Sequence, residues 1–124
     1  MWEEAGILRD RASLSRALDA LAEIDRSLDR TGVATLERKF NLTWHDWLNL
    51  KSLVLVSRAI AAAALAREES RGAHYRTDFP TSKPPDDLAY CRVRLAKGEI
   101  ALDWQPVHFT RVKPGETLLR NDAA

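Results

Sequence analysis

Leu53–Ala66 reads LVLVSRAIAAAALA, and Arg58 is the single charged residue in this run. Such a run leaves almost no polar face on a helix, and a helix that is apolar all round is normally buried all round. In a chain of 124 residues a neighbouring helix can cover one flank, whereas covering the whole circumference is difficult. We therefore expect part of this helix to pack on something outside the chain.

The same run argues against a membrane span, because it contains 14 residues and a charge whereas a transmembrane helix needs about 20 apolar residues. The whole sequence is 45% apolar and 30% charged, which is ordinary for a soluble globular protein. A formal net charge of +1 gives no electrostatic reason to propose nucleic acid or an anionic membrane as a partner.

The N-terminus and the cysteine content predict a cytoplasmic protein. Residues 1–4 lack the basic and apolar regions of a signal peptide. Cys91 is the only cysteine in the sequence, so it can form neither a disulfide framework nor a cysteine metal site. A chain without disulfides suits a reducing compartment. We expect a cytoplasmic location and no direct insertion into a membrane.

A second helix is predicted upstream of the apolar run. Between Leu14 and Leu28 the apolar residues recur at spacings of three and four, which places them on one stripe of a helix. Ser13 is interpreted as the N-cap of this helix, and Gly32 as the residue that ends it. A short helical turn is expected within residues 1–8.

The helix that contains the apolar run is predicted to extend from Trp44 to about Arg71. Thr43 and Asp46 lie three residues apart and resemble a capping box at its start, with Asp in place of the usual Glu or Gln. The segment between the two helices, residues 33–42, is ambiguous because it offers only a single turn's worth of apolar surface.

The pattern changes after Pro80. Residues 81–87 include two consecutive prolines and are predicted as an extended, non-helical linker. Apolar and polar residues then alternate in Tyr90–Leu95 and again in Ile100–Trp104, and the turn at residues 96–99 would join these segments as a β-hairpin. The remainder, to Ala124, is predicted as a poorly ordered tail.

The predicted fold is mainly α. Residues 1–80 form a small helical bundle of about three helices, one of them long. Residues 81–124 form the linker, the C-terminal β-hairpin and the tail of the same domain.

The segment with the richest chemistry is Glu69–Pro80, ESRGAHYRTDFP, at the exit of the apolar helix. A polar cluster in such a place is costly unless its groups find partners. Two interpretations stay open: these side chains contact another domain or support an active site from behind it, or they pair with Glu68, Glu69 and Asp78 to clamp the helix exit. The clamp is favoured for any single residue. The candidate residues are Arg67, Arg71, His74, Arg76 and Asp78.

Other patterns carry no catalytic, cofactor or metal hypothesis. The three histidines do not have the spacing of metal ligands. Ser70 lies near His74 in sequence, but no orienting group or oxyanion element accompanies the two. Gly72 is expected to supply the left-handed residue that ends the helix. Trp44 and Trp47 are interpreted as packing residues, with a partner surface as the alternative.

Glu69–Pro80 resembles the closing signature of the succinate dehydrogenase and fumarate reductase flavoprotein family, which includes L-aspartate oxidase. Residues 1–10, MWEEAGILRD, resemble the opening of that family's C-terminal domain, and residues 104–107, WQPV, the end of its terminal hairpin. The resemblance implies a helical bundle beside the FAD-binding and substrate-capping domains of an enzyme that oxidises or reduces a dicarboxylate. The stretch Ala73–Arg76 and the hairpin beyond Pro80 favour the succinate/fumarate branch, whereas Ala89–Cys91 departs from it.

The FAD-binding fingerprint of the family is missing from this sequence. The family seats the FAD pyrophosphate on a G-x-G-x-x-G turn, but the glycines here lie far apart, at positions 6, 32, 72, 98 and 115. The resemblance places the catalytic arginine and the substrate-binding histidines in upstream domains, and none maps onto this chain. We therefore expect no cofactor here, FAD in a partner domain or subunit, and an inactive isolated chain.

Such a chain would be either an excised C-terminal domain or a naturally separate subunit. The alternative function is a free-standing helical interaction or assembly module with no redox role. Both hypotheses allow a homo-oligomer through the apolar helix.

Overall fold

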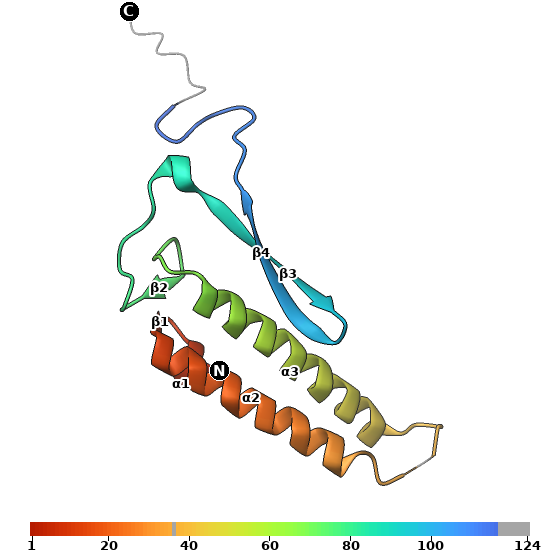
Figure 1. Cartoon of the computed structure of the whole chain (residues 1–124). Helices are drawn as coiled ribbons and strands as arrows, with labels where there is room; N and C mark the ends of the chain where they lie inside the picture. Colours follow the sequence, from red (N-terminus) through yellow and green to blue (C-terminus); the bar gives the residue numbers. More distant parts are fainter. Residues whose placement is uncertain (36, 117–124) are drawn as a thin grey trace, which may run out of the picture.

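A computed structural model describes residues 1–35 and 37–116 of the chain. Two long helices, α2 (Arg11–Thr31) and α3 (Leu42–Ala66), lie side by side and antiparallel (Figure 1). A short helix, α1 (Trp2–Ala5), precedes them. The predicted bundle is confirmed, although two of its helices are long where one was expected.

The strands form two separate sheets. At one end of the helix pair, β1 (Leu8–Arg9) and β2 (Tyr75–Arg76) make a two-residue parallel pair. After a short 3₁₀ turn, η1 (Pro85–Asp87), β3 (Ala89–Ala96) and β4 (Glu99–Pro106) form an antiparallel hairpin that contacts α3. Figure 1 shows this hairpin beside α3, on the side away from α2.

The start of α2 is set by an aspartate. The Asp10 side chain accepts a hydrogen bond from the backbone N–H of Ser13 at 2.8 Å, and the Ser13 hydroxyl accepts one from the backbone N–H of Asp10 at 3.1 Å. This reciprocal capping box makes Asp10 the N-cap and Ser13 the third helical residue, so the predicted N-cap was wrong. The predicted end is confirmed, because Gly32 has a φ of 57° and donates its N–H to Leu28.

The start and the end of α3 both differ from the prediction. Its N-cap is Asn41, whose side chain accepts a hydrogen bond from the N–H of Trp44 at 3.0 Å, so no Thr43–Asp46 capping box forms. The helix ends at Ala66 rather than near Arg71, because Arg67 is already extended, with φ −83° and ψ 105°.

The core of the domain lies between α2 and α3. Lys51 and Arg58 of α3 both reach Asp25 of α2, at 2.5 and 3.1 Å, and so add ion pairs along one flank of this contact. The buried apolar side chains of the described residues are Leu14, Ala17, Leu21, Val54, Ala61 and Ala64.

By length and composition alone, α3 is long enough to cross a membrane. Its 25 residues include an 18-residue window of mean hydropathy 1.5, so the 14-residue run understated its length. Lys51 and Arg58 lie on this helix and pair with Asp25 of α2. Such charges are costly inside a bilayer.

The hairpin is confirmed with its predicted turn. Lys97 and Gly98 both have positive φ angles, 52° and 85°, as a tight two-residue hairpin turn requires. Leu95 pairs with Ile100 beside the turn. The linker at residues 81–87 is only partly as predicted. Residues 81–84 have no regular secondary structure, but Pro85–Asp87 form the 3₁₀ turn η1, so the prediction of a wholly non-helical linker was wrong. The predicted tail lies outside the described residues from position 117 onward.

Candidate functional site

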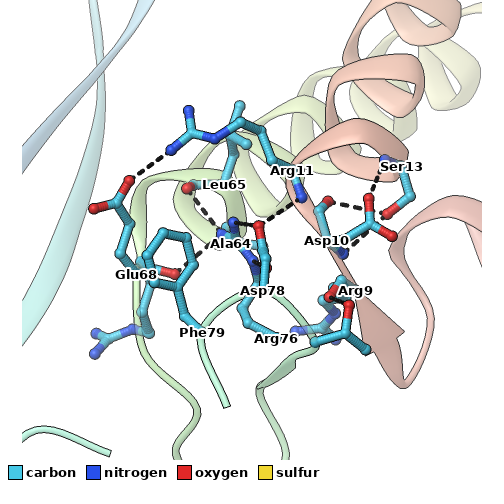
Figure 2. A network of polar contacts seen from close by, with 12 residues as sticks. Arg9, Asp10, Arg11, Ser13, Ala64, Leu65, Glu68, Arg76, Asp78 and Phe79 are labelled. Atoms are coloured by element: carbon cyan, nitrogen blue, oxygen red, sulfur yellow. Dashed lines mark hydrogen bonds and ion pairs between the residues drawn. The ribbon is translucent and has the colours of Figure 1, made fainter. Parts of the chain in front are cut away.

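Arg76 is fully buried, and its guanidinium closes the C-terminal end of α3 (Figure 2). Its Nη1 donates hydrogen bonds to the backbone oxygens of Ala64, Leu65 and Arg67 at 3.0, 3.0 and 3.1 Å. The last carbonyls of a helix lack intrahelical partners and carry the negative end of the helix dipole. A cation supplied by a residue outside the helix therefore ends α3.

Asp78 binds the other side of the same guanidinium. Its Oδ1 accepts from Arg76 Nε at 2.7 Å and its Oδ2 from Nη2 at 2.6 Å, a two-point pair. Oδ2 also accepts the backbone N–H of Arg11, the first residue of α2, at 3.0 Å. One ion pair thus joins the negative end of α3 to the positive end of α2 (Figure 2). Hydrogen bonds from Arg76 hold the pKa of Asp78 far below its usual range.

We call Ser70, Arg76 and Asp78 the clasp. The buried Ser70 hydroxyl accepts a hydrogen bond from the backbone N–H of Arg76 at 2.8 Å and donates one to the carbonyl of Phe79 at 2.8 Å. These bonds hold the loop that places the guanidinium. In this arrangement the Ser70 hydroxyl has a structural role.

Glu69 is a second buried acid at the same end of the molecule. Its carboxylate accepts from Arg67 Nη1 at 2.6 Å, from Arg71 Nε at 3.3 Å and from the backbone N–H of Lys83 at 3.1 Å. Burial alone would raise the pKa of Glu69, but these three donors outweigh it and hold the pKa below its usual value. Two of the predicted acid partners therefore pair with signature arginines, whereas Glu68 pairs with Arg11 instead.

Arg67 also connects α3 to the hairpin. Its guanidinium lies over the Trp104 ring, 4.8 Å from the ring centroid, and donates to the carbonyl of Ala89 at 3.3 Å. Arg67 and Arg71 do not share a helix face, because α3 ends before both of them, yet both side chains reach Glu69. A cation over an indole face adds a stabilising contact between two elements.

His74 contacts the N-terminal segment. Its Nδ1 accepts a hydrogen bond from Arg9 Nη1 at 2.7 Å, which requires a neutral ring with its proton on Nε2. Burial, and then the positive charge of Arg9, lower the pKa of His74. Gly72 is left-handed as predicted, with a φ of 56°, but it lies in the turn between Arg71 and His74 rather than at the helix end.

We predict that acid weakens the fold partly through His74. An unfolded histidine titrates near pH 6.5, and in the folded chain its pKa is lower. Below about pH 6.5 the unfolded state therefore binds more protons, and stability falls as the pH falls. Urea unfolding at several pH values measures this. Between pH 7.5 and 5.5, roughly the span of one histidine titration, the free energy of unfolding should decline less in His74→Gln than in wild type. An equal decline in the variant would refute this, and His45→Gln serves as the exposed control.

The N-terminal contribution to this site was missed by the sequence interpretation. The N–H of Thr77 donates to the carbonyl of Arg9 at 2.8 Å, and β1 pairs with β2. Arg9 and Arg11 therefore lie beside the clasp although more than 50 residues separate them from it. The Asp10-x-x-Ser13 capping pattern was the signal that could have located the start of α2 here. The structure brings all five candidate residues to this one end, each with a partner in the chain.

The N-terminus of α2 does not fit the phosphates of FAD. A dinucleotide pyrophosphate binds where backbone N–H groups at a helix N-terminus are free to meet it. At the N-terminus of α2 those groups already meet the carboxylates of Asp10 and Asp78. Two anions there would repel a third. Among residues 1–35 and 37–116, no group of three acids, histidines or cysteines is placed to hold a metal ion.

The described residues thus form an antiparallel helix pair that the clasp closes at one end, with a hairpin beside α3. The family model described as fumarate reductase flavoprotein C-term matches residues 1–118, so the chain belongs to this family.

The relatives that this chain matches are much longer than the chain. The fumarate reductase flavoprotein subunit of Mycobacterium tuberculosis is 37% identical over 113 residues, which are 90% of this chain and 19% of that protein. The Haemophilus influenzae subunit of the same name is 32% identical, over 99% of this chain and 21% of that protein. A solved quinol fumarate reductase FrdA chain from E. coli has a TM-score of 0.81 and 28% identity, covering 93% of this chain and 20% of its own. The chain spans about one fifth of these proteins.

Proposed function

We propose that this chain is the non-catalytic C-terminal helical domain of an FAD-dependent oxidoreductase that reduces fumarate or oxidises succinate. The observation that carries the proposal is that the candidate residues are committed to partners inside the chain. Arg76 and Asp78 bind each other and two helix ends, and His74 binds Arg9. Groups held in this way stabilise a domain, whereas a catalytic group must be free to meet substrate or cofactor.

The proposed role of the domain is structural. It packs against the flavin-bearing part of the enzyme, in the same polypeptide or in a separate subunit, and FAD and substrate bind there. The names and lengths of the relatives support that placement, since each is a flavoprotein subunit about five times as long as the matched region. The composition and the single cysteine support a cytoplasmic location.

The purified chain is expected to be colourless and unable to reduce fumarate. The physical reason is the missing glycine fingerprint together with the carboxylates at the N-terminus of α2. An absorption spectrum after incubation with excess FAD and removal of free cofactor, with a reduced-dye assay on fumarate, measures both. Retention of one FAD per chain, or measurable turnover, would refute the proposal.

A free-standing interaction module is the second candidate function. Exposed Leu53, Val56 and Ile60 on α3 favour it, because an unpartnered apolar flank also suits a binding protein. The neighbouring DNA separates the two hypotheses. A reading frame for a flavin-binding domain, in frame or adjacent, supports the enzyme domain, and its absence supports the module.

A further inference from the structure

One flank of the helix pair is apolar and open. Leu53, Val56 and Ile60 follow one another at spacings of three and four on α3 and are 61%, 55% and 50% exposed. Ile24 of α2 is 47% exposed. Ile24 directly precedes Asp25, and successive helical residues lie about 100° apart around the helix axis. Ile24 therefore lies on the flank opposite the Asp25 ion pairs. We call Ile24, Leu53, Val56 and Ile60 the apolar flank.

The apolar flank contains no charge along its length. The helical positions three or four residues before or after its members include Ala20, Ser27, Asn49 and Ala63, and none of these positions carries a charged residue. The other flank carries Lys51, Arg58 and Asp25. The two flanks of one helix pair thus differ sharply, and the apolar one has the character of the centre of a protein interface.

We propose that the apolar flank docks on an apolar surface of the flavin-bearing part of the enzyme. The inference rests on the proposed function and goes beyond it by naming the surface. The matched relatives carry about four fifths of their length outside the region that this chain covers. The amphipathic neighbour α2 already covers one side of α3, and Figure 1 shows the hairpin on another. The remaining partner must therefore bring apolar atoms, since an uncharged flank gains most by excluding water.

The test is a chimera in which this chain replaces the C-terminal fifth of the Mycobacterium tuberculosis subunit. Hydroxyl-radical footprinting read by mass spectrometry compares side-chain accessibility in the free chain and in the chimera. We expect the modification rates of Leu53, Val56 and Ile60 to fall about fivefold or more in the chimera, as at a water-excluding interface centre. Leu95 is the matched control, because it is 58% exposed and lies on the hairpin; its rate should change by less than about twofold.

The outcomes separate this inference from the proposed function. If the chimera retains FAD but the apolar flank stays as reactive as in the free chain, the docking surface is wrong and the function stands. If the chimera loses FAD while the unaltered subunit retains it, the proposed function fails first. If the flank is already protected in the free chain and light scattering gives a dimer mass, a second copy is the occupant and the inference is overturned. Leu53→Gln should then abolish that dimer.

Discussion

Replacing Arg76 with methionine should lower the free energy of unfolding by about 3–5 kcal/mol, because several backbone carbonyls lose their donor at about 1–3 kcal/mol for each unsatisfied buried group. Arg76 is fully buried, and the variant removes the donor to the backbone oxygens of Ala64, Leu65 and Arg67 and the cation that pairs with Asp78. Small domains have only about 5–15 kcal/mol of stability, so the variant would lose a large share of it. Urea unfolding followed by circular dichroism measures the change.

Two further variants make this result interpretable. Arg76→Lys keeps the charge but cannot reach three carbonyls and a carboxylate with a planar fork, so it should recover only part of the loss. Arg92→Met removes an arginine from the exposed Arg92–Asp103 pair of the hairpin and should leave the free energy of unfolding nearly unchanged. A small effect of Arg76→Met, equal to that of Arg92→Met, would contradict the clasp.

Asp78→Asn should cost about 3–5 kcal/mol, because it leaves the fully buried guanidinium of Arg76 without its counter-ion. It also removes an anion from the N-terminus of α2, where Asp78 accepts the N–H of Arg11. The pKa of Asp78 is lowered on folding, so its stabilisation is full above its unfolded pKa near 3.9 and is lost as the pH falls through the acid range below that value. As the pH falls through the acid range, the free energy of unfolding should therefore decrease less steeply in Asp78→Asn than in wild type.

The double variant Arg76→Met/Asp78→Asn tests whether the two residues act as one unit. If they do, its loss of stability should be smaller than the sum of the two single losses by about 1–3 kcal/mol, the coupling seen for residues in one network. Strict additivity would show that each side chain stabilises its own helix end independently.

The sequence predicted those parts of the fold whose signals are local. The apolar stripe from Leu14 to Leu28 and the glycine after it defined α2 and its end, because period and cap lie within one helix. The alternation in residues 90–104 and the turn between its halves defined the hairpin in the same way. In both cases nothing distant had to be known.

The end of α3 could not be predicted from local signals in the sequence. Helical propensity continues through Arg67 and Glu68, so the pattern extends the helix to about Arg71. The helix ends earlier because Arg76 donates to the carbonyl of Ala64, twelve positions before it. The same holds for the clasp: the signature identified Arg76 and Asp78, but the N–H of Arg11 that completes it lies 67 positions away from Asp78. Spacing along the chain carries no information about such a partner.

The open flank of α3 lies between these two cases. Its apolar excess was visible in Leu53–Ala66, and the exposure of Leu53, Val56 and Ile60 agrees with the expectation that this helix needs a partner outside the chain. Which flank stays open depends on where α2 and the hairpin pack.

We infer that the clasp stabilises the domain and takes no part in the chemistry. The direct test is fumarate turnover per bound FAD, measured in the chimera with Arg76→Lys and with Asp78→Asn. We expect a lower melting temperature for both variants and turnover per flavin within about twofold of the parent chimera. A fall of more than about tenfold in turnover per flavin, at an unchanged melting temperature, would instead place these residues in the catalytic machinery.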